Sequence, residues 1–182
     1  MYRITPCLLS LLLLLVSCKK EKEKDPLSQL PPETQTGANT FGCLINGEIF
    51  KPGGAQLSGG SLQCNYQFVD KAYYFVLIGR YRMKRVGNSV GLYADSLQIQ
   101  KGQKYILKSR TMGNSSGTIL LDKDLTYDRF VTDGSSYTGE LWIKHFDTVG
   151  QIASGTFWFD AVSETGEVVQ VREGRFDMGY RR

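Results

Sequence analysis

The sequence predicts an all-β fold, either an antiparallel sandwich or a barrel. Short apolar and aromatic runs follow one another from residue 40 to the end of the 182-residue chain, and Gly, Asn, Asp or Ser separates nearly all of them. The composition agrees, because 20 Gly, 10 Tyr and 9 Phe stand against only 5 Pro. After residue 40, no stretch of twelve residues repeats apolar positions at the spacing of an amphipathic helix. Without helical crossovers, neighbouring strands are expected to pair antiparallel.

Residues 1–17 are predicted to be a signal peptide. Arg3 precedes an apolar stretch at residues 7–16, which has the length of a secretory h-region and is too short to cross a bilayer of about 30 Å. The four residues Leu-Val-Ser-Cys at 15–18 resemble the lipobox of bacterial lipoproteins. The resemblance implies cleavage before Cys18 and acylation of its thiol, which would attach the protein to a membrane. An ordinary signal peptide with a free cysteine nearby is the alternative.

Residues 18–39 are predicted to be a solvated, flexible tether. Mixed charges fill residues 19–25, and Pro, Gln, Thr and Gly dominate residues 26–39, so this segment has little apolar surface to bury. Lys19 directly follows Cys18, which resembles retention in the outer membrane rather than the inner one. Whether the domain faces the periplasm or the cell surface stays open.

Residues 40–182 are predicted to form one all-β domain. Asn46 and Gly47 separate two apolar runs and predict a type I′ hairpin, because both central positions of that turn need positive φ. Residues 73–78 are apolar on both faces and predict a central strand. Strands are expected at residues 62–69, 72–81, 90–93, 96–100, 103–108, 118–121, 127–132, 137–146, 152–162 and 168–176.

Two cysteines remain in the domain after cleavage and acylation, Cys43 and Cys64. Disulfides persist in the cell envelope, and both residues fall on predicted strands that neighbouring positions in a sheet could bring together. We therefore expect a disulfide between them, with two buried free thiols as the alternative.

Enzymatic motifs are weak. Ser89 and Ser115 each lie in a G-x-S-x-G pattern, and Asp122 and His145 follow in the order of a hydrolase triad. The pattern requires a strand before the serine and a helix after it, whereas turn-like and strand-like residues flank both matches. We expect no enzyme, with a hydrolase as a distant alternative.

No metal site or cofactor is predicted. Residues 122–128 hold three carboxylates, but Thr126 and Tyr127 occupy the places where a calcium loop needs a further ligand and a glycine. A solvated hairpin loop explains this segment. His145 is the only histidine, which excludes most histidine-based zinc sites.

Two surface features point to binding. Arg80, Arg82 and Lys84 fall on one side of a predicted strand with Tyr81 between them, so they form a positive stripe for an anionic glycan or a protein partner. A charged edge strand that blocks aggregation is the plainer explanation. Trp158 alternates with inward-facing neighbours and could serve as a sugar-stacking platform. A net charge of +4 is too small to predict a nucleic-acid partner.

Both ends of the domain resemble uncharacterised lipoproteins of Bacteroidota that carry an all-β domain of unknown function. The opening residues 40–52 contain F-x-C-x-x-N-G-x-x-F, and residues 153–177 contain G-T-F-x-F-x-A followed by G-x-V-V-x-V-x-x-G-R-F-D. The resemblance implies an envelope location and no particular activity. Ser96 and Thr148 each follow Asp and precede an aliphatic residue, which is similar to the O-glycosylation sites of such bacteria.

Together these features predict a lipid-anchored outer-membrane lipoprotein with a non-catalytic binding or structural role. A glycan-binding accessory protein that uses Trp158 or Tyr81 is the alternative. A concave surface lined by aromatic side chains would favour binding, whereas a closed, featureless surface would favour a structural role.

Overall fold

The computed structural model describes residues 25–54, 60–82, 87–123 and 126–182, and it confirms the all-β fold. One short 3₁₀ helix, η2 (Pro26–Gln29), precedes twelve strands in the described residues. The strands are β1 (Thr40–Ile45), β2 (Glu48–Phe50), β3 (Gly53–Gly54), β4 (Leu62–Val69), β5 (Ala72–Arg82), β6 (Gly87–Asp95), β7 (Lys104–Leu107), β8 (Ser115–Lys123), β9 (Thr126–Val131), β10 (Gly139–Asp147), β11 (Ile152–Ser163) and β12 (Val168–Gly179).

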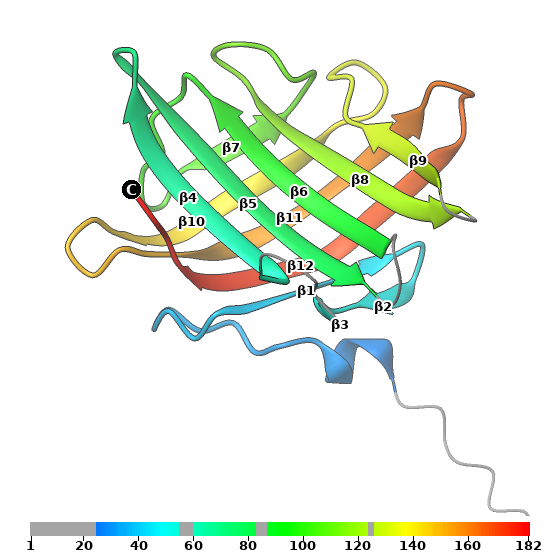
Figure 1. Cartoon of the computed structure of the whole chain (residues 1–182), viewed down its shortest axis with the longest axis horizontal. Coiled ribbons are helices and arrows are strands. Elements are labelled where there is room, and N and C mark those ends of the chain that lie inside the picture. The colour runs from blue at the N-terminus through cyan, green and yellow to red at the C-terminus, as the bar shows by residue number, and fades with distance from the viewer. Residues whose placement is uncertain (1–24, 55–59, 83–86, 124–125) are drawn as a thin grey trace, which may run out of the picture.

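The strands form two layers that are joined along both sides (Figure 1). One layer contains β4, β5, β6 and β8, and the other contains β10, β11, β12 and β1. On one side, β7 pairs with both β10 and β8, and β9 pairs with both β8 and β11. On the other side, Arg181 follows β12 and meets β4: its N–H donates to the Cys64 carbonyl (3.0 Å), and its carbonyl accepts from the Tyr66 N–H (2.8 Å). The fold is therefore a sandwich closed like a flattened barrel.

The predicted hairpin and central strand are confirmed. Asn46 and Gly47 have φ values of 50° and 85°, and β5 lies between β4 and β6. The strand predicted at residues 96–100 is wrong, because Ser96 takes a positive φ of 54° directly after β6 and turns the chain into a loop. Most neighbours pair antiparallel as expected, but β3 with β5 and β7 with β8 form short parallel contacts.

The hydrophobic core lies between the two layers, and alternate residues of each strand supply it, as the pleat of a strand requires. Its fully buried large side chains are Phe75, Leu77, Val90, Leu92, Leu107, Ile119, Phe130, Leu141, Ile143, Phe159, Val169 and Val171. Close packing also needs small residues. A Cβ at Gly79 would lie 2.7 Å from Cδ1 of Phe41, so a glycine at this position lets that ring enter the core.

Residues 25–39 pack against the domain, which corrects the predicted solvated tether over this part of the chain. We call this segment the strap. Asp25 caps η2 by accepting the Leu27 N–H (3.0 Å), and Leu30 is buried, with 7% of its surface exposed. Composition suggested a solvated chain because the strap has few apolar residues. Polar contacts hold it instead, and most of them are hydrogen bonds to one buried carboxylate of the domain.

That carboxylate belongs to Asp177 on β12 and is fully buried. Its oxygens accept hydrogen bonds from the strap and from β11: Thr34 Oγ1 (2.6 Å), Thr36 N (3.0 Å), Thr36 Oγ1 (3.3 Å), Gly37 N (2.8 Å), Ala38 N (3.2 Å) and Ser154 Oγ (2.7 Å). Burial alone would raise the pKa of Asp177. The hydrogen bonds from Thr34, Ser154 and the strap backbone outweigh burial and hold the pKa well below its usual value.

Replacing Asp177 by asparagine should destabilise the protein and change how its stability depends on pH. The folded-state pKa of Asp177 is below the unfolded value of about 3.9, so the stability it contributes is present above about pH 4 and is lost as the pH falls towards the folded-state pKa. We expect Asp177→Asn to lower the free energy of unfolding at pH 7 by about 1–3 kcal/mol and to lose less further stability between pH 5 and pH 3 than the wild type. Urea denaturation at each pH measures both effects.

Asp70→Asn is the matched control, because Asp70 is an exposed carboxylate in the turn between β4 and β5. It should follow the wild-type pH dependence. Identical pH profiles for Asp177→Asn and the wild type would contradict the role given to the buried carboxylate.

Candidate functional site

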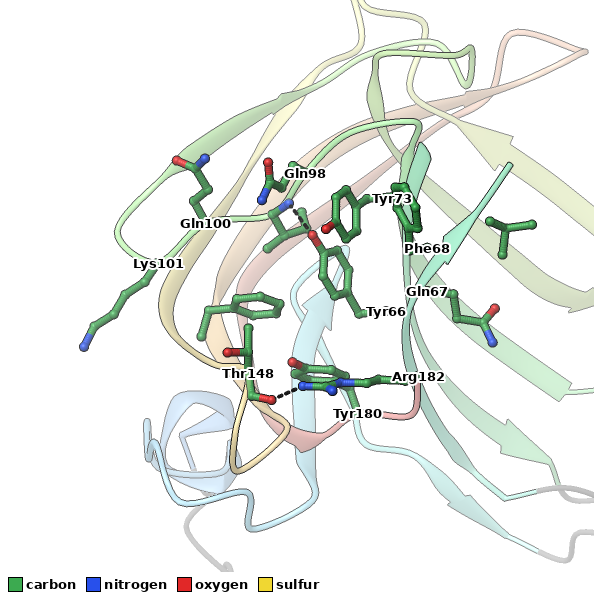
Figure 2. Close-up of a pocket in the computed structure, with 13 residues that line it drawn as sticks. Tyr66, Gln67, Phe68, Tyr73, Gln98, Gln100, Lys101, Thr148, Tyr180 and Arg182 are labelled. Atoms are coloured by element: carbon green, nitrogen blue, oxygen red, sulfur yellow. Dashed lines mark hydrogen bonds between the residues drawn. The ribbon is translucent and has the colours of Figure 1, made fainter. Parts of the chain in front are cut away.

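An aromatic pocket of about 710 Å³ opens at one end of the sandwich, where β4, β10 and the C-terminal segment meet (Figure 2). Its volume lies within the range of about 300–1,000 Å³ that is typical of small-molecule sites. We call it the aromatic pocket, and its lining residues are Tyr66, Gln67, Phe68, Val69, Tyr73, Gln98, Ile99, Gln100, Lys101, Phe146, Thr148, Tyr180 and Arg182.

Five rings from four parts of the chain pack together in the pocket. The ring of Tyr66 on β4 stacks on Tyr73 of β5 with a centroid distance of 5.2 Å, and the edge of Phe146 meets it at 5.0 Å. Tyr180, just after β12, stacks on Phe146 at 5.3 Å. Phe68 tilts against Tyr73 at 4.7 Å. These separations are those of favourable aromatic pairs, so the rings hold one another in place.

Hydrogen bonds to and from tyrosine hydroxyls hold the loop at residues 96–103 over this end of the sandwich. The Tyr66 hydroxyl accepts the Ile99 N–H (3.3 Å), and the Tyr105 hydroxyl accepts the Gln100 N–H (2.8 Å) and donates to the Gln98 carbonyl (3.1 Å). Burial raises the pKa of Tyr66 to about 12, so the phenol stays neutral. The pocket is therefore preformed, because tyrosine side chains that shape it are already hydrogen-bonded to the backbone.

The charged side chains in the lining are both cations. Lys101 and Arg182 are exposed, and Arg182 donates a hydrogen bond to the Thr148 carbonyl. Phe68 is 62% exposed and Val69 is 48% exposed, so apolar surface continues from the pocket onto the protein surface. The lining therefore combines an apolar interior with cationic groups.

Trp158 lies outside this pocket, on the solvent side of β11. Its side chain is 41% exposed, and the Arg172 guanidinium lies 5.5 Å from the ring centroid. The residue lines a smaller hollow of about 380 Å³ that also contains Glu140 and Arg175. An arginine therefore covers part of the ring that was predicted to stack on sugar.

The predicted basic stripe lies in the other layer. Tyr81 is 37% exposed near the end of β5, where it pairs with Asn88 of β6. Arg80 is half-buried and donates a hydrogen bond to Gln63, while Arg82 is half-buried at the last position of β5. Lys84 lies outside the described residues. The structure thus does not bring Tyr81, Arg80 and Arg82 together with Trp158.

In the described residues, the serines and the histidine of the weak hydrolase pattern are not linked by hydrogen bonds. Ser115 is buried and its hydroxyl donates to the Ile106 carbonyl (2.9 Å). In the described part of the chain, no hydrogen bond links His145 to Ser89 or Ser115. Among the same residues no cluster of three His, Cys, Asp or Glu side chains could hold a metal ion; Asp124 lies outside them.

The two O-glycosylation candidates differ in exposure. Thr148 is exposed in the turn between β10 and β11, whereas Ser96 is half-buried and its hydroxyl donates to the Tyr74 hydroxyl (3.2 Å). Modification of either remains a prediction. Cys18 and the signal peptide lie outside the described residues. No helix among the described residues is long and apolar enough to span a membrane.

The aromatic pocket was not predicted from the sequence, although a signal for it exists. Tyr66, Phe68, Phe146 and Tyr180 lie near the ends of β4, β10 and β12, and Tyr73 lies at the start of β5. An alternating up-and-down order of strands brings these positions to the same end of a sandwich. The order of the strands in the sheet, which a single sequence does not reveal, decides whether they meet.

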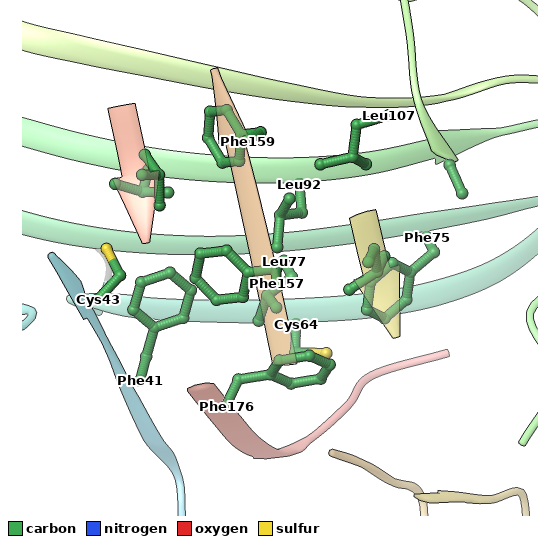
Figure 3. Packing of buried hydrophobic residues seen from close by; sticks show 14 of the residues in the cluster. Phe41, Cys43, Cys64, Phe75, Leu77, Leu92, Leu107, Phe157, Phe159 and Phe176 are labelled. Carbon is green, nitrogen blue, oxygen red and sulfur yellow. The ribbon is translucent and has the colours of Figure 1, made fainter. Parts of the chain in front are cut away.

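The predicted disulfide between Cys43 and Cys64 is not formed. Both cysteines are free and buried, with Cys43 on β1 and Cys64 on β4, and Figure 3 shows their sulfur atoms apart in the packed core. The two strands belong to opposite layers and are not paired with each other. Burial raises the pKa of both thiols, that of Cys64 to about 12, so both behave as small apolar residues.

Thiol labelling tests this arrangement. In the mature chain, residues 18–182, carrying Cys18→Ser, we expect Cys43 and Cys64 to resist iodoacetamide at pH 8 while the protein is folded, because burial blocks access and disfavours the thiolate. After denaturation without reductant, mass spectrometry should find two alkylated cysteines. A fully denatured protein that incorporates label only after reduction would show that the disulfide forms after all.

The comparisons with known proteins do not supply a relative for this domain. No protein family, no curated protein and no solved structure matches the chain. Its function is therefore argued from the geometry and chemistry of its own residues.

Proposed function

We propose that this protein is a lipid-anchored lipoprotein of the cell envelope that binds a small molecule in the aromatic pocket and does not catalyse a reaction. The observation that carries the proposal is the pocket itself, a hollow of about 710 Å³ lined by five rings. Its size and apolar lining are those of ligand sites. Because hydroxyl–backbone hydrogen bonds already hold Tyr66 and the covering loop, a ligand would order few side chains on binding.

The membrane attachment rests on the resemblance of residues 15–18 to a lipobox and on the envelope context implied by the Bacteroidota-like motifs. The position of the strap limits how far the domain can lie from an acylated Cys18. Asp25, which caps η2, comes only seven residues after Cys18, so the chain between them can span at most about 25 Å when fully extended. An acylated Cys18 would thus keep the domain close to its membrane. We propose that this membrane is the outer membrane and that the domain lies on either its periplasmic or its cell-surface side.

Glycan binding is the second candidate, since the pocket is concave and aromatic. Sugars stack on open ring faces, however, and Tyr66 and Tyr73 cover each other while Phe146 and Tyr180 do the same. Of the five rings, Phe68 is the most exposed. On the other side of the molecule, Trp158 has Arg172 against it. The arrangement therefore favours an apolar ligand over a stacked sugar.

Binding of a neutral apolar dye tests the pocket directly. N-phenyl-1-naphthylamine should gain fluorescence in the presence of the protein, and Phe68→Ala or Phe146→Ala should weaken its binding about tenfold, because each removes a ring from the lining. Tyr127→Ala is the control, since Tyr127 is an aromatic residue of β9 that is 48% exposed and outside the pocket. Absence of dye binding to the folded wild type, or equal weakening by the control, would contradict the proposal.

Acylation has a separate test. In a bacterial host that lipidates exported proteins, a radiolabelled fatty acid should be incorporated into the wild type and into Cys7→Ser, because Cys7 lies in the segment expected to be removed. Cys18→Ser should incorporate none, and its N-terminal peptide should lack acyl mass. Equal labelling of Cys18→Ser would place the acyl group elsewhere.

A further inference from the structure

We propose that the ligand of the aromatic pocket is an anionic amphiphile, with an apolar chain among the rings and a carboxylate or phosphate head at Lys101 and Arg182. This inference rests on the proposed function and names the chemical class of the ligand. It follows from three features of the lining: an apolar interior, charged side chains of one sign, and apolar surface that continues outward.

The interior offers contact surface rather than polar specificity. Ile99 is 2% exposed, Tyr66 is 8% exposed and Tyr180 is 3% exposed, and the Tyr66 and Tyr180 hydroxyls bond to the backbone of Ile99 and Asp147. The rings of Tyr66 and Tyr180 therefore offer carbon atoms to the pocket while their hydroxyl groups are engaged. Such a surface favours an alkyl chain, which needs no hydrogen bonds, over a molecule covered with hydroxyl groups.

The charged groups favour an anion. Lys101 and Arg182 supply the charged side chains of the lining, and no Asp or Glu belongs to it. Within the described residues no carboxylate lies within ion-pair distance of Lys101. Asp147 interacts with Lys101 at longer range, but its Oδ1 accepts the Val149 N–H (2.8 Å). A carboxylate or phosphate head group would be an anionic partner for these cations, which no Asp or Glu of the lining supplies.

The second hollow, beside Trp158, differs from the aromatic pocket in its charged side chains. It is lined by both acids and bases, and its charges are largely satisfied within the protein: Lys144 pairs with Glu33 of the strap, and Arg172 pairs with Asp160. Cations that are already paired with carboxylates attract an added anion only weakly. The aromatic pocket differs because its cationic side chains lie next to apolar surface, with no Asp or Glu in the lining.

Apolar side chains continue from the pocket to its surroundings. Phe68 is 62% exposed and Val69 is 48% exposed in the lining, and Val149, in the turn after β10, is 92% exposed. A chain longer than the pocket would find apolar contacts as it leaves. A lipid-anchored protein would also hold this pocket near a source of acyl chains, in keeping with the proposed function.

Competition against the neutral dye tests the ligand class. The protein is the mature chain with Cys18→Ser, which carries no acyl group and needs no detergent. Decanoate, decanol and decyltrimethylammonium, each below its micelle concentration, compete for N-phenyl-1-naphthylamine. We expect decanoate to displace the dye at about tenfold lower concentration than decanol, and the cation to be weakest. Lengthening the acid from eight to ten carbons should tighten binding by about fourfold per methylene.

Charge variants locate the head group. Lys101→Gln and Arg182→Gln should each weaken decanoate about three- to tenfold and leave decanol unchanged, because only the acid meets these cations. Lys51→Gln and Arg129→Gln are matched controls at exposed positions outside the pocket. Thermal melting of each variant shows that it is folded before its affinity is compared.

The outcomes separate this inference from the proposed function. Equal displacement by acid, alcohol and cation, or a decanoate preference that survives in both pocket variants, would overturn the anionic amphiphile and leave a small-molecule site. Displacement by maltotriose but not by decanoate would overturn it in favour of a glycan. If the wild type does not bind the dye or any competitor, the proposed function itself fails.

Discussion

A single buried carboxylate organises the entry of the chain into this fold. Asp177 has no described cationic partner, and it is satisfied by hydroxyl and N–H donors from the strap and from Ser154 of β11. Hydrogen bonds to a charged acceptor are stronger than those between neutral groups, and a buried carboxylate without them would be costly. The strap therefore docks where it does because β12 presents a charge that only these donors satisfy.

Closure of the sandwich and construction of the pocket depend on the same few residues. The backbone of Arg181 bridges to β4, while its neighbours Tyr180 and Arg182 line the aromatic pocket. The C-terminal segment thus joins the two layers and supplies a ring and a cation to the open end. Stacking of Tyr180 on Phe146 ties this segment to β10 as well. A change that loosened the C-terminal bridge would alter the pocket too.

Local sequence patterns predicted the parts of the fold that local physics controls. Asn46 and Gly47 specify their turn because positive φ is inexpensive for these residues, and residues 73–78 specify a strand with a neighbouring strand on each edge. The prediction failed at residues 96–100, where the residues alternate as in a strand but Ser96 turns the chain. It failed in the strap for a different reason, because the donors of Thr34 and Gly37 have no partner until β12 is in place.

The sequence by itself determined an all-β domain, a predicted lipid anchor at Cys18 and the hairpin that begins the domain, because composition, short motifs and turn chemistry act over a few residues. Only the tertiary structure decided that Cys43 and Cys64 lie on strands that do not pair with each other, and that Tyr66, Phe146 and Tyr180 form one pocket. These outcomes depend on which strands become neighbours. That choice is made by long-range packing and pairing, which no short stretch of sequence encodes.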